Sequence, residues 1–137
     1  MHKIFIPLLS ALALAGCAAH STSTMSSASL HGEVAIYDQQ HVTRQALPHT
    51  RAYDNTSLSR YEFKASGEGK PALYGVLPLQ INTANMVSGV LLFPPALLAA
   101  RGVYAFYDFD LDRGVVRYRE READAWAEYL PPAAAAR

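Results

Sequence analysis

The 137-residue sequence has a single cysteine, Cys17, and therefore cannot form an internal disulfide framework. It also has no excess of charge of either sign, because twelve basic residues face twelve acidic ones and the formal net charge is +0. Nucleic-acid binding normally needs a concentrated basic surface. The composition therefore predicts neither a disulfide-stabilised scaffold nor a nucleic-acid partner.

Several catalytic and metal-binding signatures are missing as well. The chain has no G-x-S-x-G elbow and no glycine-rich phosphate loop. Zinc-binding histidines usually come in close pairs, and the histidines after residue 17 are too widely spread for that. They are His20, His31, His41 and His49. We expect these four to be surface residues, and we expect no metal site and no cofactor.

No apolar run is long enough to cross a bilayer as a helix, which takes about 20 residues. The first apolar stretch, Ile4 to Ala15, follows a short basic start that contains Lys3. Its length and position suit the apolar region of a secretory signal. The second stretch, Met86 to Ala100, has Ser88 as its one polar side chain and is interrupted by two prolines.

The first apolar stretch ends in Leu14-Ala15-Gly16-Cys17, which resembles the lipobox of bacterial lipoproteins at all four positions. The resemblance implies that a diacylglyceryl group is attached to the Cys17 thiol, that the chain is cut before Cys17, and that the new amino terminus is acylated. Several acyl chains give stable membrane anchoring. Ala18 stands where inner-membrane members of the family usually carry Asp, so the resemblance favours the outer membrane of the bacterial envelope.

These features divide the chain into three parts. Residues 1–16 are expected to be a lipoprotein signal peptide, and residues 17–30 a lipidated cysteine followed by a flexible tether. The segment from Ala18 to Leu30 is mostly Ala, Ser and Thr, so it has little bulky apolar surface to offset the entropy of ordering. Residues 31–137 are long enough for one small domain with a modest core.

For this domain we predict an α+β fold, in which a small antiparallel sheet is covered by short apolar helices and by a C-terminal amphipathic helix. Alternating apolar residues predict strands near Val34 and Ile36, over residues 59–65 and over residues 72–77. Ala123, Trp126, Ala127 and Leu130 recur at helical spacing, which predicts the C-terminal helix over residues 121–130, with Trp126 as a core anchor.

The strongest local pattern predicts a β-hairpin from residues 103–110 and 115–120. With Leu111 to Gly114 as the loop, Asp108 lies opposite Arg117 on one face. On the other face Phe109 pairs with Val116 and Tyr107 with Tyr118. Shifting this register by one residue would place Arg117 opposite Phe109, which the hydrophobic pattern disfavours.

The apolar stretch Met86 to Ala100 is expected to form two short helices that meet at Phe93, the second beginning at Pro94-Pro95. Two placements stay open. In the first, the stretch covers the sheet as core, with the side chains of Leu91, Leu92, Phe93, Leu97 and Leu98 packed against the strands. In the second, it rests on the bilayer that holds Cys17.

Two classes of function follow from these features. The first is a lipid-anchored, non-enzymatic envelope module that contacts other envelope proteins, lipid or cell-wall polymer. The second is a small ligand-binding or hydrolytic domain that uses Asp108 and Asp110 with Arg117, as paired carboxylates can in a cleft. Asp108, Asp110 and Asp112 also resemble the start of a calcium loop, but Arg113 stands where the motif requires glycine. We therefore predict a solvated turn there.

Overall fold

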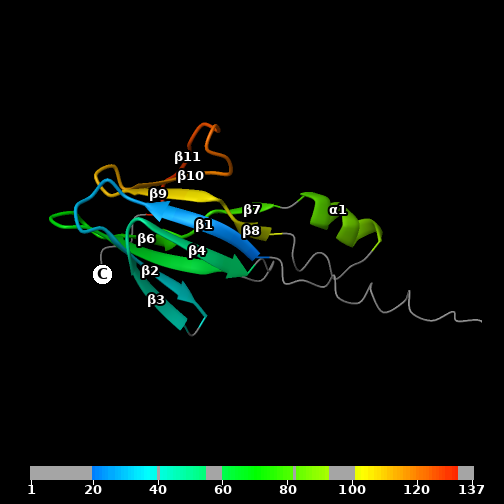
Figure 1. Ribbon diagram of the computed structural model, residues 1–137, viewed down its shortest axis with the longest axis horizontal. Helices are drawn as coiled ribbons and strands as arrows, with labels where there is room; N and C mark the ends of the chain where they lie inside the picture. The colour runs from blue at the N-terminus through cyan, green and yellow to red at the C-terminus, as the bar shows by residue number, and fades with distance from the viewer. Residues whose placement is uncertain (1–19, 40, 55–59, 82, 93–100, 133–137) are drawn as a thin grey trace, which may run out of the picture.

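The protein's structure, a computed structural model, describes residues 20–39, 41–54, 60–81, 83–92 and 101–132 (Figure 1). These residues form eleven strands and one helix. In chain order they are β1 (His20–Ser26), β2 (Glu33–Asp38), β3 (His41–Ala46), β4 (His49–Asp54), β5 (Tyr61–Ser66), β6 (Leu73–Val76), β7 (Leu79–Ile81), α1 (Thr83–Leu91), β8 (Arg101–Val103), β9 (Phe106–Asp110), β10 (Val115–Arg119) and β11 (Ala127–Tyr129).

Nine of these strands build two sheets. The larger sheet has the order β11-β10-β9-β1-β4, and the smaller has the order β3-β2-β5-β6. Strands β7 and β8 pair separately as a short ribbon. β1 and β9 run parallel, whereas the other strand pairs are antiparallel. Strand β1 therefore lies inside the larger sheet, between β9 and β4, which both come later in the chain.

The hydrophobic core lies between the two sheets, and aromatic rings join them. Phe63 of β5 packs against Phe109 of β9, with ring centroids 5.1 Å apart. Tyr61 of β5 meets Tyr53 of β4 edge-on at 5.2 Å. Each of these pairs takes one ring from each sheet, as expected for inner faces that interdigitate. Other core side chains come from both sheets and from the segments between them, namely Met25, Val34, Ile36, Ala65, Leu77, Val103, Tyr107, Leu111 and Val116.

The predicted hairpin is confirmed, including its register. Strands β9 and β10 pair with Asp108 opposite Arg117 and with Tyr107 opposite Tyr118. Tyr107 is fully buried, and so is Phe109, so this face of the hairpin faces the core. The expected strands near Val34 and over residues 59–65 and 72–77 correspond to β2, β5 and β6.

The predicted α+β class is wrong, because the described residues are mostly β. The C-terminal amphipathic helix is absent from residues 121–130, where a turn leads into strand β11 beside β10. Leu130, which the helical spacing had placed in an apolar stripe, is 70% exposed. Trp126 is half-buried and lies over arginine side chains, outside the core. Pairing with β10 gives this segment backbone partners that a local pattern cannot reveal.

The core placement of the apolar stretch is also wrong for the part of it that the structure describes, residues 86–92. One helix, α1, covers Thr83–Leu91, and it does not lie over the sheets (Figure 1). Leu91 is 72% exposed and Leu92 is 84% exposed, so neither packs against the strands. The expected second helix, with Phe93, Leu97 and Leu98, falls at residues 93–100, outside the described residues.

The prediction of a flexible tether over residues 17–30 is wrong from His20 onward. Residues His20–Ser26 form β1, which pairs with β4 on one side and with β9 on the other. Met25 is 1% exposed and Ser23 is fully buried, so β1 contributes side chains to the interior. Two strand partners supply the stabilisation that the composition of this segment does not suggest.

Candidate functional site

Four polar side chains form a row across the outer face of the larger sheet, and we refer to them as the outer-face row. Ser26 of β1 pairs with Asp108 of β9, Asp108 pairs with Arg117 of β10, and Arg117 pairs with Glu128 of β11. Alternate residues of a strand point to opposite faces, so these four project away from the core that Met25 and Tyr107 enter. The row brings together residues that are up to 102 positions apart in a single rung of the sheet.

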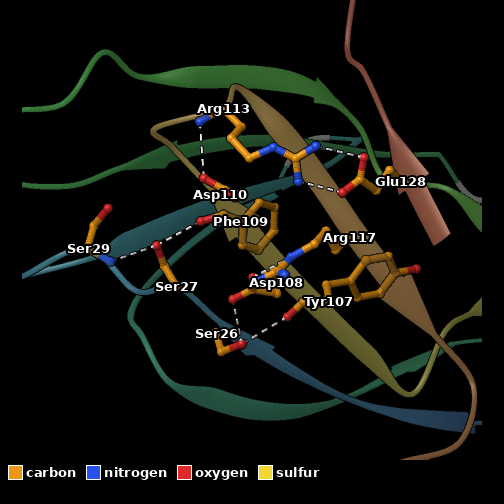
Figure 2. Close-up of polar contacts among 10 residues, drawn as sticks. All are labelled: Ser26, Ser27, Ser29, Tyr107, Asp108, Phe109, Asp110, Arg113, Arg117 and Glu128. Carbon is orange, nitrogen blue, oxygen red and sulfur yellow. Dashed lines mark hydrogen bonds and ion pairs between the residues drawn. The ribbon is translucent and has the colours of Figure 1, made fainter. Parts of the chain in front are cut away.

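Asp108 is the most enclosed member of the row. Its side chain is 11% exposed, and one carboxylate oxygen, Oδ2, accepts hydrogen bonds from Nε of Arg117 at 3.0 Å and from a terminal guanidinium nitrogen of Arg117. Its other oxygen, Oδ1, accepts a hydrogen bond from the Ser26 hydroxyl at 3.0 Å (Figure 2). Both oxygens of the carboxylate are therefore occupied by donors from neighbouring strands.

Glu128 does not bond to its cross-strand neighbour Arg117 but to Arg113 in the hairpin loop. The two guanidinium nitrogens of Arg113 donate to the two carboxylate oxygens at 2.5 and 3.0 Å, as Figure 2 shows. This two-pronged contact lowers the pKa of the Glu128 carboxyl and raises the pKa of Arg113. Both side chains are exposed, so the pair lies in water at the rim of the row.

The next rung of the same face carries a stacked arginine. The guanidinium carbon of Arg119 lies 4.2 Å from the centre of the Trp126 ring and 5.4 Å from that of Phe106. A terminal nitrogen of Arg119 donates to the backbone carbonyl of Glu122 at 2.6 Å. Arg119 thus fixes the turn before β11 onto the sheet, through cation–π contacts and a backbone hydrogen bond.

The three aspartates that suggested a calcium loop have three different partners. Asp108 bonds to Arg117 and Ser26, as described above. Asp110 accepts a hydrogen bond from the backbone N–H of Arg113 at 3.0 Å and so closes the hairpin loop. Asp112 pairs with Lys70 from the loop between β5 and β6. Within the described ranges, no group of three His, Cys, Asp or Glu side chains is arranged to hold a metal ion.

The histidines are also spread over the molecule. His20 begins β1, His41 begins β3 and His49 begins β4. His31 lies between β1 and β2, where its Nε2 is 3.4 Å from a carboxylate oxygen of Glu68. The remaining predicted site residue, Cys17, lies outside the described residues.

A second surface, at the end of the molecule where α1 lies, is apolar. We call it the α1 surface and define it as Met86, Val87, Val90, Leu91 and Leu92, which are all exposed. A membrane-crossing helix, which must be long and apolar, is not found within the described residues.

Comparison with protein-family models, with curated proteins and with solved structures found no match to the chain. Conclusions about function therefore depend on the residues and their geometry.

The hairpin pattern predicted the central pair of the outer-face row, Asp108 and Arg117, but not its other members. Ser26 was missed because its segment lacks an apolar pattern, and Glu128 because its segment was assigned to a helix. The order Ala127-Glu128-Tyr129, which places a charged side chain between two apolar ones, was the signal available in the sequence.

Proposed function

We propose that the protein is a lipid-anchored lipoprotein of the bacterial envelope whose domain is a non-enzymatic interaction module. The anchor is Cys17, acylated after cleavage of the signal peptide at residues 1–16, and the support for it is the lipobox Leu14-Ala15-Gly16-Cys17. Ala18 after the cysteine favours the outer membrane over the inner one. The domain faces the periplasm, where its partners are the membrane itself and other envelope proteins.

The distance between the anchor and the domain supports a module that works close to the membrane. Strand β1 begins at His20, three residues after Cys17. Three residues span at most about 11 Å whatever their conformation. A lipid on Cys17 therefore holds the larger sheet within about one strand length of the headgroups, with little freedom to reach distant partners.

The observation that carries the non-enzymatic part is the closed pairing of the outer-face row. A carboxylate that acts as a general acid or base must exchange a proton with a substrate, and its oxygens must be accessible to that substrate. Both oxygens of Asp108 accept hydrogen bonds from Ser26 and Arg117, and Asp110 is bonded to the hairpin loop. This pairing favours the non-enzymatic module over the hydrolytic alternative, which relied on Asp108, Asp110 and Arg117.

The anchor can be tested with a Cys17→Ser variant of the full chain. Without the thiol no diacylglyceryl group can be attached, so we expect the variant to lose incorporation of a labelled fatty acid and to accumulate as the uncleaved precursor. Mass spectrometry of the amino-terminal peptide gives the lipid directly. If the Cys17→Ser protein matured and sedimented with membranes as the wild type does, the anchor proposal would be wrong.

An Ala18→Asp variant is the matched control, because it changes the neighbouring residue and keeps the thiol. We expect this variant to be lipidated normally and to move from the outer-membrane fraction to the inner-membrane fraction on a density gradient. Normal lipidation without any change of membrane would leave the anchor standing and would contradict the outer-membrane assignment.

A further inference from the structure

The α1 surface is unusual because its aliphatic side chains point away from the domain. Val90 is 69% exposed, Leu91 is 72% exposed and Leu92 is 84% exposed, and Met86 and Val87 are exposed as well. Large aliphatic side chains gathered in one patch, and not scattered singly, mark a surface that contacts another apolar phase.

The arrangement along the helix is the reverse of the usual one. At about 100° per residue, Met86, Val87, Val90 and Leu91 fall within an arc of about 140°. An apolar stripe of this width normally faces the core of its own domain. Here the stripe is exposed, whereas Gly89, which lies outside the arc, is buried. The helix thus turns its smallest residue inward and its aliphatic residues outward.

The α1 surface lies at the same end of the molecule as the start of β1. Helix α1 follows β7, and β7 pairs with β8 through Ile81 and Arg101. Strand β9 follows β8 and runs parallel to β1 with Phe106 opposite Thr24, so β8 lies beside the beginning of β1. Figure 1 shows α1, β7, β8 and the first residues of β1 together at one end.

We propose that the α1 surface inserts into the headgroup and acyl boundary of the same bilayer that holds the lipid on Cys17. This inference depends on the proposed function, because it takes the anchor as given. The anchor lies three residues before β1, so the end of the domain that carries α1 is the end held nearest to the membrane. A folded apolar surface there would meet acyl chains without any further movement of the chain.

Charge favours a bilayer over a protein groove as the occupant. Residues 83–92 contain no charged side chain, so the helix brings no ion into the acyl region. Arg101 is exposed beside Ile81, which is itself 58% exposed, and these two flank the helix at its amino-terminal side. An apolar face rimmed by a basic residue suits an interface of acyl chains and phosphate groups.

The test uses the full, lipidated chain in vesicles of phosphatidylethanolamine and phosphatidylglycerol. Acylation consumes the thiol of Cys17, so a Leu91→Cys variant carries a unique thiol for an environment-sensitive fluorophore. We expect the emission of this label to shift to the blue on reconstitution and to be lost when the vesicles contain a lipid-bound quencher. A Glu68→Cys label, in the exposed loop between β5 and β6, is the control and should stay unquenched.

Charged substitutions extend the test. Val90→Asp, made in the Leu91→Cys background, should weaken insertion by about tenfold or more and restore the water-exposed emission, because it would place an ion among the acyl chains in place of an aliphatic side chain. Val42→Asp is the matched control, since Val42 is a 52% exposed valine on β3 of the smaller sheet. Both valines are exposed, so neither change removes a core contact, and circular dichroism should show both variants folded.

The outcomes separate the two proposals. Absence of lipid on Cys17 would overturn the anchor and this inference together. A lipidated chain that floats with vesicles but keeps the Leu91 label in water would overturn this inference alone. The Leu91 label could also be protected in detergent as well as in vesicles and stay out of reach of the lipid-bound quencher. That result would show that a second copy or another part of the chain covers the helix, and it would overturn this inference too.

Discussion

At the scale of single residues, strand β1 carries one serine on its inner face and another on its outer face, and their hydroxyls have different surroundings. Ser23 points inward and is fully buried, and its hydroxyl has no hydrogen-bond partner among the described residues. Ser26 points outward and donates a hydrogen bond to Asp108 at 3.0 Å. A buried hydroxyl without a partner destabilises the folded state, whereas a hydroxyl bonded to a charged group stabilises it.

Alanine substitution should therefore have opposite effects at these two positions. Ser23→Ala removes an unpaired polar group and should raise the free energy of unfolding by about 1 kcal/mol. Ser26→Ala leaves one oxygen of Asp108 without its donor and should lower the free energy of unfolding by about 1–2 kcal/mol. Urea denaturation of the two variants gives both values. Equal effects of the two substitutions would show that β1 does not have one face in the core and one outside it.

At the scale of elements, the sequence predicted those strands whose side chains carry a local pattern. The hairpin is the clearest case, because Tyr107 and Phe109 alternate with Asp108, and Val116 and Tyr118 alternate with Arg117. This alternation predicts both the strands and their register, since a one-residue shift would bury an arginine. The central pair of the candidate site followed from the same pattern.

Elements that depend on distant partners could not be predicted in this way. Strand β1 has the sequence HSTSTMS, in which Met25 is the single large apolar side chain. Its stability comes from pairing with β4 and β9, and the second of these lies some 80 residues away. In the C-terminal segment, Ala123, Trp126 and Ala127 recur at helical spacing, but Trp126 stacks on Arg119 and Ala127 begins a strand beside β10. Tertiary contacts override local propensity in both segments.

Met25 offers a direct test of β1 as a structural element. It is 1% exposed in the core, and its sulfur lies 3.8 Å from the hydroxyl of Tyr53. Met25→Ala should lower the free energy of unfolding by about 2–5 kcal/mol, because it leaves a cavity between the sheets. Thr22→Ala on the same strand is the control, since Thr22 is exposed, and it should change stability much less. A Met25→Ala variant as stable as the wild type in urea would contradict β1 as a core strand and would favour the flexible tether that the composition predicts for this segment.

At the scale of the whole molecule, two buried tyrosines join parts that are distant in sequence. The Tyr107 hydroxyl donates to the carbonyl of Pro78 at 2.6 Å and accepts from the backbone N–H of Tyr104 at 2.9 Å. Tyr53, which packs across to Tyr61 of the opposite sheet, is 4% exposed. Burial raises the pKa of Tyr53 from 10.0 to about 12, and burial likewise raises the pKa of Tyr107.

These raised pKa values predict that stability falls in alkali. Well below pH 10 both tyrosines are neutral whether the chain is folded or unfolded, so they give no pH dependence there. Between pH 10 and about 12 the unfolded chain releases protons that the folded core retains, so the unfolded state binds fewer protons and the free energy of unfolding decreases as the pH rises. Each buried tyrosine should contribute a slope of about 1.4 kcal/mol per pH unit in this window. Urea denaturation at closely spaced pH values measures the slope.

Tyr53→Phe should remove its own share of that slope, whereas Tyr74→Phe, at a 45% exposed position outside the core, is the matched control and should leave the slope unchanged. A Tyr53→Phe variant with the full wild-type slope would mean that the Tyr53 hydroxyl is accessible to water and that the two sheets do not close over it.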